Sequence, residues 1–185
     1  MGVKKFLILV ALFTTIFSTC NAAQVRLANI DAENFLGKMT EILQTDTMRQ
    51  RIPINITKLI RDEKGDIPDY NLTAWGAVFA KSPSTEPEGV VTFFTDTSGY
   101  VNSMKFVFQT TSDWAEKYEA MLMSALWALD FTPDEAGQLI RNGETKDGMY
   151  TSAVRIDRQN KNFIIIMNKI NDMIITLLMA TDGQK

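Results

Sequence analysis

The sequence predicts an α+β fold: a mainly antiparallel sheet of about six or seven strands, with two or three helices packed on one face. Seven short segments are rich in β-branched and aromatic residues, as strands are. Other segments carry apolar residues at helical spacing behind a capping residue. The links between consecutive strands are short, and this requires antiparallel neighbours, because a parallel crossover needs about a dozen residues or more.

The strand candidates form a group of four and a group of three, separated by helical segments. In the fourth candidate, Met104, Phe106 and Phe108 share one face, while Lys105 and Val107 lie on the other. We expect one continuous curved sheet that grips the longest helix. The seven segments are 55–61, 72–81, 89–95, 100–109, 149–157, 162–169 and 173–180.

Each helix candidate begins with a recognisable cap. Asp31 is the expected N-cap of a first helix that fades near residues 44–47. The longest helix is expected at about 113–130, where Asp113 and the Glu three residues later resemble a capping pair. The third begins at Thr132-Pro133-Asp134-Glu135, with a capping Thr, a Pro at the first helical position and a Glu that completes a capping box.

The aromatic residues offer few candidates for ligand contact. Trp75, Trp114 and Trp127 each lie on a predicted strand or helix stripe, so we expect them to pack in the core rather than to stack on a ligand. Tyr70, in the polar loop 68–71, is the best exposed aromatic candidate for a ligand contact.

The N-terminus has the three parts of a secretory signal peptide. Residues 1–5 carry Lys4 and Lys5 and no acid. Residues 6–17 are almost wholly apolar, and residues 18–23 are polar and end in small side chains. The apolar run is too short for a membrane span, which needs about 20 residues. The N-terminus therefore predicts export.

The preferred cleavage point follows Ala22, and cleavage after Ala23 fits nearly as well. This divides the chain into a signal peptide, 1–22, and a single exported α+β domain, 23–185, in the periplasm or outside the cell. Cleavage removes the chain's only Cys. A secreted domain without thiols is typical of a bacterial envelope, because extracellular animal domains often depend on disulfides.

Cys20 gives an alternative. The residues that end in Cys20 resemble the Leu-x-small-Cys box of bacterial lipoproteins, but Phe17 replaces the usual Leu and Thr19 the usual Gly or Ala. Lipidation of Cys20 would tether the domain to a membrane.

Composition excludes several classes of function. The chain has no His, so His-based triads are impossible, and the mature domain lacks the thiols of a zinc or nucleophilic site. Its net charge of −3 and the lack of basic runs predict no nucleic-acid binding. The acidic segments 62–66 and 96–99 are interpreted as turns. The sequence therefore predicts no catalytic residue, no metal ligand and no cofactor.

The apolar segment 163–180 resembles a membrane span on hydropathy alone. Lys169 and Asp172 lie at its centre, and each costs about 2.5–3.5 kcal/mol on the insertion scale. A hairpin with a polar turn accounts for this pattern directly, so the sequence predicts no transmembrane helix in the mature chain.

The functional hypothesis is an exported, non-enzymatic domain that binds a small ligand or an envelope protein. One alternative is a carboxylate-based or metal-assisted hydrolase. Another is a lipid-anchored accessory subunit of an envelope complex. A wide pocket between sheet and helices would favour ligand binding. Two inward carboxylates would favour the enzyme, and an exposed apolar patch would favour a protein partner.

Overall fold

The computed structural model describes residues 25–45, 55–61, 73–80, 89–96, 98–110 and 114–183; for 55–61, 73–80 and residue 114 it describes the backbone alone. Several predictions lie outside the described residues and stay predictions. They concern the cleavage sites at Ala22 and Ala23, lipidation at Cys20, the ligand contact of Tyr70, the turn at 62–66 and the cap at Asp113.

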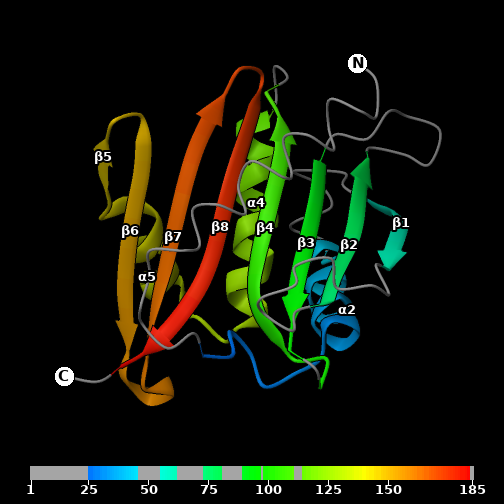
Figure 1. Cartoon of the computed structure of the whole chain (residues 1–185), viewed down its shortest axis with the longest axis horizontal. Coiled ribbons are helices and arrows are strands. Elements are labelled where there is room, and N and C mark those ends of the chain that lie inside the picture. The colour runs from blue at the N-terminus through cyan, green and yellow to red at the C-terminus, as the bar shows by residue number, and fades with distance from the viewer. Residues whose placement is uncertain are drawn as a thin grey trace.

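The described strands form a single antiparallel sheet in the order β1-β2-β3-β4-β8-β7-β6-β5 (Figure 1). The first four strands follow one another across the sheet, and the last four return toward them, so that β8 pairs with β4. The strands are β1 (Asn55–Arg61), β2 (Thr73–Ala80), β3 (Gly89–Thr95), β4 (Val101–Gln109), β5 (Glu144–Lys146), β6 (Met149–Ile156), β7 (Lys161–Ile170) and β8 (Met173–Asp182).

Three described helices lie together on one face of this sheet (Figure 1). They are α2 (Ala32–Leu43), α4 (Trp114–Ala128) and α5 (Pro133–Arg141), and a short 3₁₀ turn, η2 (Asp157–Gln159), joins β6 to β7. The predicted α+β fold with helices on one face is confirmed. The three-residue strand β5 was not among the predicted strands.

The predicted caps of α2 and α5 are present. Asp31 accepts a hydrogen bond from the Asn34 backbone N–H at 2.9 Å. The Thr132 hydroxyl accepts from the Glu135 backbone N–H at 3.3 Å, and the Glu135 carboxylate accepts from the Thr132 N–H at 2.8 Å, which completes the capping box. These local bonds fix where the two helices begin.

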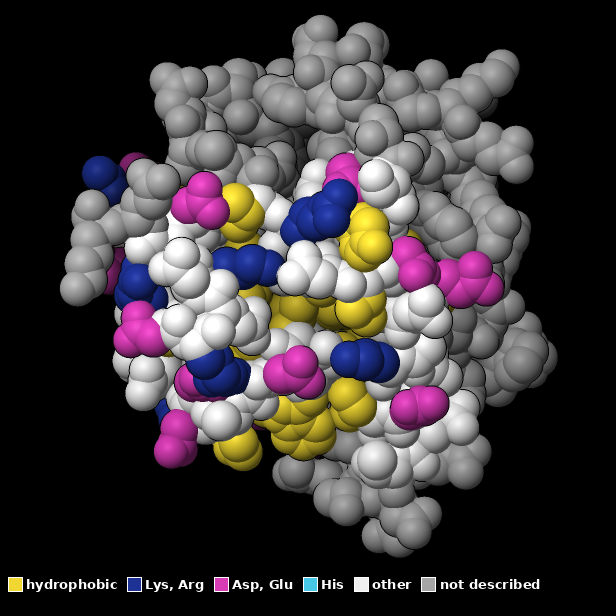
Figure 2. Space-filling model, turned by 90° about the horizontal axis from the view of Figure 1, so that it is seen from below, with side chains coloured by type: hydrophobic (Ala, Val, Ile, Leu, Met, Phe, Trp, Pro, Cys, Tyr) yellow, Lys and Arg dark blue, Asp and Glu magenta, His cyan; other side chains and the backbone are white. Residues whose placement is uncertain are grey.

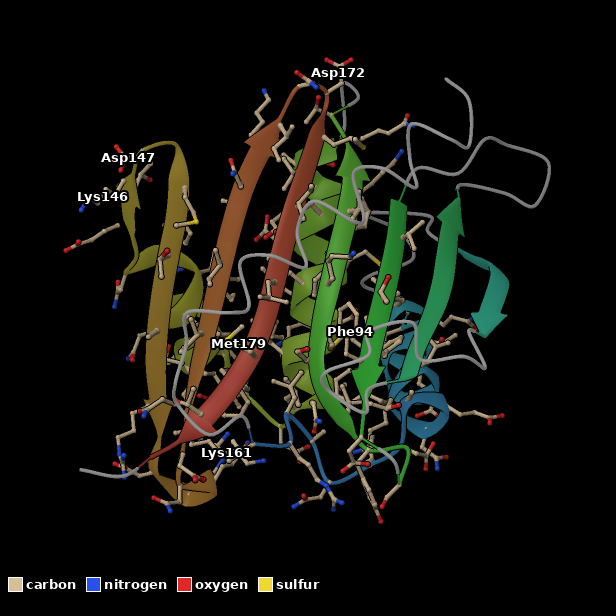
Figure 3. All side chains as sticks on the ribbon, in the orientation of Figure 1. Phe94, Lys146, Asp147, Lys161, Asp172 and Met179 are labelled. Carbon is tan, nitrogen blue, oxygen red and sulfur yellow. The ribbon has the colours of Figure 1, made fainter. Side chains whose placement is uncertain are left out.

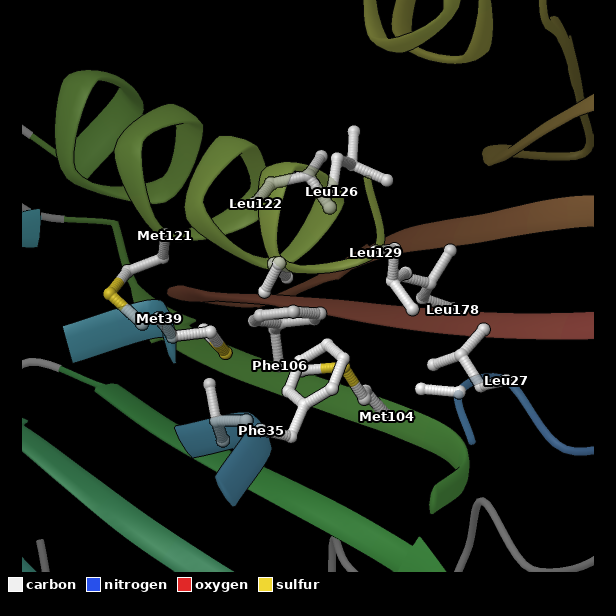
Figure 4. Close-up of a cluster of buried hydrophobic side chains, with 14 of the residues drawn as sticks. Leu27, Phe35, Met39, Met104, Phe106, Met121, Leu122, Leu126, Leu129 and Leu178 are labelled. Carbon is white, nitrogen blue, oxygen red and sulfur yellow. The ribbon is translucent and has the colours of Figure 1, made fainter. Parts of the chain in front are cut away.

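The core fills the space between the helices and the sheet. Phe35 and Met39 of α2, Phe106 of β4 and Met121 of α4 are all fully buried, and they meet in one cluster (Figure 4). Burial of each such side chain contributes about 1.5–3 kcal/mol. Trp127 contradicts the prediction of core packing: it is 36% exposed, because the apolar stripe of α4 is wide enough for one large side chain to turn outward.

The strand β8 occupies the middle of the sheet, and its residues 173–180 are buried on both faces. This explains why its sequence is an almost continuous apolar run instead of an alternation. The one polar residue within the run, Thr176, forms a hydrogen bond of 2.8 Å with the Tyr118 hydroxyl of α4.

The strands β7 and β8 form the hairpin that was predicted for 163–180. Ile170 pairs with Met173, so the turn is Asn171-Asp172, and Asn171 has a positive φ of 53°. Among the residues that the structure describes, no helix has the length and apolar content needed to cross a bilayer.

Candidate functional site

A pocket of about 500 Å³ opens at one end of the helix–sheet interface, where α4 ends. Seen from that end, apolar side chains form a band in the middle of the face, with Lys, Arg, Asp and Glu around it (Figure 2). The volume lies within the range of about 300–1,000 Å³ typical of small-molecule sites. The lining residues are Leu27, Ala28, Asn29, Ile30, Lys38, Ala128, Leu129, Asp130, Arg158, Gln159 and Lys161.

The first wall is the segment before α2, residues 27–30. The backbone N–H groups of Leu27 and Ala28 donate to the Val101 carbonyl at 2.7 and 3.2 Å, and the Val101 N–H donates to the Ile30 carbonyl at 3.3 Å. These bonds hold the segment against the start of β4. The wall is therefore fixed by backbone contacts; Leu27 and Ala28 are buried in it, Ile30 is partly exposed and Asn29 is exposed.

The second wall is the end of α4. The helix stops at Ala128, and Asp130 adopts a left-handed conformation with φ 62° that turns the chain toward α5. The Asp130 N–H donates to the Trp127 carbonyl at 2.9 Å. The small side chains of Ala28 and Ala128 face the same pocket, and their size leaves room between the two walls.

The third wall is the connection from β6 to β7. The Gln159 amide donates to the Leu129 carbonyl at 2.8 Å and ties η2 to the end of α4. Asn160 has a positive φ of 49°, which closes the turn and starts β7 at Lys161. Three segments far apart in the sequence thus meet at the pocket.

Arg158 is engaged within the protein. Its guanidinium forms an ion pair with Glu135 and also donates to the Asp130 carbonyl. The hydrogen bond from Arg158 is the main reason that the pKa of Glu135 falls to about 2. Because Glu135 also completes the capping box of α5, this pair fastens the third wall to that helix.

Lys161 has a different environment. Its ammonium donates to the Arg26 carbonyl at 2.7 Å, and the Leu27 carbonyl lies 3.5 Å away. Burial lowers the pKa of Lys161, and the charge of Asp182 opposes this effect. Within the described part of the chain, no carboxylate lies within ion-pair distance of the Lys161 ammonium. A positive charge at this pocket is therefore held by uncharged carbonyl groups.

The pocket lining combines apolar, cationic and carboxylate side chains. Among its lining residues, Asp130 is the single carboxylate, whereas hydrolysis by a carboxylate pair requires two. The described residues contain no group of three or more His, Cys, Asp or Glu side chains placed to hold a metal ion. An apolar floor beside an ammonium group suits a ligand with an apolar body and a polar end.

The turn at 96–99, interpreted from the sequence as a hairpin turn, connects β3 and β4 outside the pocket. The Asp96 carboxylate accepts hydrogen bonds from the backbone N–H groups of Ser98 and Tyr100 at 2.8 and 3.1 Å. It also accepts from the Arg26 guanidinium at 2.6 Å, and Arg26 lies over the Tyr100 ring, 4.1 Å from its centroid. These contacts stabilise the turn.

The pocket-lining cations Lys38, Arg158 and Lys161 were not predicted as site residues. The sequence predicts strands at 149–157 and 162–169 and hence a connection at 158–161; the connection is present, but β7 already begins at Lys161. A connection rich in polar residues is usually only solvated. These residues meet because segments far apart in the sequence pack together, and no sequence motif indicates that packing.

The fold and the site define the class of an antiparallel α+β domain with a helical layer on one face and an amphipathic pocket at one end. Comparison with protein-family models, with curated proteins and with solved structures finds no match to this chain.

Proposed function

We propose that this chain is an exported, non-enzymatic domain that binds a small ligand in the pocket at the end of α4. The pocket is the observation that carries the proposal. It combines apolar walls with an ammonium group, and it is built from segments fastened by backbone and side-chain hydrogen bonds. Such a site binds without needing large rearrangement of the backbone.

The ligand-binding alternative is favoured over a protein partner by the described surface. The described residues include one exposed large hydrophobic side chain, Trp127, and a single residue makes no docking patch. A carboxylate-based hydrolase has less support, because Asp130 is the one carboxylate in the pocket lining. The export part of the proposal is supported by the N-terminal pattern of charge, apolar run and small residues.

The test of ligand binding is purification of the protein from its native envelope without denaturation, followed by mass spectrometry of the small molecules released on unfolding. Asn29 is exposed and lines the pocket, so Asn29→Trp fills the opening. The matched control, Gln138→Trp, adds the same side chain at an exposed position of α5 outside the pocket lining. We expect a ligand with the wild type and with Gln138→Trp, and a loss with Asn29→Trp. Equal recovery from all three forms would contradict the proposal.

The test of export is the mass of the N-terminus of the protein recovered from cells. We expect an unmodified chain that starts at Ala23 or Gln24. A lipid attached to Cys20 would instead identify a membrane-anchored subunit, and an intact chain with Met1 recovered from the cell interior would contradict export.

A further inference from the structure

The charge of the pocket differs from the charge of the whole protein. The chain has 22 acidic and 19 basic residues, but the pocket lining contains three cations and one acid. The cations are Lys38, Arg158 and Lys161. A concave site with this charge attracts anions and raises their local concentration.

The three cations do not have the same availability. Arg158 already binds Glu135 and the Asp130 carbonyl, so its charge is largely compensated inside the protein. Lys38 is exposed on α2, where salt and water screen its charge. Lys161 is only half-exposed, and its acceptors are two backbone carbonyls that carry no formal charge. Lys161 is therefore the strongest anchor for an anion.

The geometry of Lys161 leaves capacity for a ligand. An ammonium group has three N–H donors. One donates to the Arg26 carbonyl at 2.7 Å, and the Leu27 carbonyl at 3.5 Å is at the limit of hydrogen-bond distance. At least one donor remains for a ligand. The two carbonyl contacts also fix the ammonium, so less side-chain entropy is lost when an anion binds.

The apolar part of the pocket lies next to this ammonium. Leu27 and Ile30 come from the first wall, and Ala128 and Leu129 come from the end of α4. Ile30 is partly exposed, whereas Leu27 is fully buried and Ala128 and Leu129 show only small exposed edges. A ligand that carries an anionic group on an apolar body uses both parts of the pocket.

We propose that the ligand is a small amphipathic organic anion, whose anionic group binds the Lys161 ammonium and whose apolar body packs against Ile30 and the exposed edges of Ala128 and Leu129. This inference rests on the proposed ligand-binding function and names the class of its ligand. The anionic group is a carboxylate or a phosphate, since both accept hydrogen bonds from an ammonium group.

The experiment compares probes that share one apolar body. Isothermal calorimetry measures the binding of octanoate, 1-octanol and octylamine to the protein as recovered from cells and freed of bound molecules, and inorganic phosphate tests an anion without an apolar body. We expect octanoate to bind about tenfold or more tightly than 1-octanol, because a hydrogen bond to a charged group is worth about that factor or more. We expect octylamine and phosphate to bind more weakly than octanoate.

Three variants test whether Lys161 causes the preference for octanoate over 1-octanol. Lys161→Met removes the charge but keeps much of the side-chain length, and we expect it to equalise the affinities for octanoate and 1-octanol. Lys161→Arg keeps the charge and should retain a preference for octanoate. Lys146→Met removes a charge from exposed β5, at the opposite end of the sheet from Lys161, and should leave the preference unchanged (Figure 3). The ratio of affinities is compared only for variants with the wild-type circular dichroism spectrum.

The outcomes separate the two proposals. Equal binding of octanoate and 1-octanol by the wild type, with loss of both in Asn29→Trp, would overturn the anionic class and leave ligand binding in place. A preference for octanoate that persists in Lys161→Met would overturn the assignment to Lys161. Failure of all four probes to bind, together with no ligand recovered from the native envelope, would overturn both proposals.

Discussion

The interface between the helices and the sheet has two regions that differ in packing: a buried middle and an open end. In its middle, Phe35, Met39, Phe106 and Met121 are fully buried and belong to one cluster (Figure 4). At the end of α4, the same interface opens into a pocket of about 500 Å³. The middle uses large apolar side chains, whereas the pocket lining mixes Leu, Ile and Ala with polar and charged side chains. The middle stabilises the fold, and the open end is where the protein has room to bind.

This difference shows why the site lies at the edge of the core. The helical layer is interrupted where α4 ends at Ala128 and Asp130 turns the chain away. At that point hydrogen bonds, such as the one from Gln159 to the Leu129 carbonyl, add to the side-chain packing of Leu129 and Phe131. Substitutions in the middle should therefore lower the free energy of unfolding, and substitutions in the pocket lining should weaken ligand binding.

The largest expected effect is the loss of a central side chain. Phe106→Ala removes a fully buried ring from the middle region and should lower the free energy of unfolding by about 3–5 kcal/mol, because the cavity adds to the lost burial. Urea denaturation measures it. Thr151→Ala, at an exposed position of β6, is the control and should change stability by less than about 0.5 kcal/mol. Similar values for the two variants would contradict a filled middle region.

The second effect concerns the polar contact within that region. Tyr118→Phe removes the hydroxyl that bonds to Thr176, which is fully buried, and should cost about 1–3 kcal/mol of stability. In Tyr118→Phe the buried Thr176 hydroxyl loses its hydrogen-bond partner. A second substitution, Thr176→Val, removes that hydroxyl, so the double variant should be more stable than Tyr118→Phe alone. A double variant less stable than either single variant would contradict the account.

Alkaline pH acts on the same contact. Burial raises the pKa of Tyr118 to about 12, although the Thr176 hydrogen bond opposes the shift. Since the folded pKa lies above the ordinary value of 10.0, this tyrosine favours the folded state below pH 10, and the contribution is lost as pH rises from 10 to 12. Unfolding curves across this range should show a smaller pH dependence for Tyr118→Phe.

The third effect is at the open end. Thr132→Ala removes the cap of α5 next to the third wall and should lower stability by about 1 kcal/mol. Thr132→Ser keeps the capping oxygen and should lose much less. Thermal unfolding followed by circular dichroism distinguishes them. Equal losses of stability in the two variants would show that the Thr132 methyl group matters and that the capping hydroxyl contributes nothing.

The smallest effect is a change in acid sensitivity. Arg158 lowers the pKa of Glu135 from an ordinary 4.5 to about 2, so the ionised form favours the folded state at neutral pH. This contribution is present above about pH 4.5 and is lost as pH falls toward about 2. Glu135→Gln should therefore reduce the loss of stability in that range. Part of the acid sensitivity should remain in this variant, because hydrogen bonds from Asn34 also lower the pKa of Asp31. An unchanged acid transition would contradict the Arg158–Glu135 contact.

The middle region was largely predictable from the sequence, because its signals are local. The alternation of Met104, Phe106 and Phe108 predicted the inner face of β4, and the capping residues predicted the starts of two helices. The short strand β5 was missed because three exposed residues give no periodic pattern.

The open end was not predictable, because it depends on pairing between distant segments. Lys161 reaches the Arg26 carbonyl across 135 positions of sequence, and η2 reaches the end of α4 through Gln159. Neither contact leaves a motif. Trp127 shows a different error: its place on the apolar stripe predicted a buried side chain, but the side chain is exposed. Local chemistry thus predicts the elements, and the long-range pairing decides where a pocket forms.

The most direct measurement of the central claim is a titration of the isotope-labelled protein with octanoate, followed by NMR chemical shifts of the backbone amides. The account predicts saturable shifts at residues 27–30, 128–130 and 158–161, reduced in Lys161→Met and unchanged in Lys146→Met. Shifts absent from these three segments, or equal in the two variants, would contradict it.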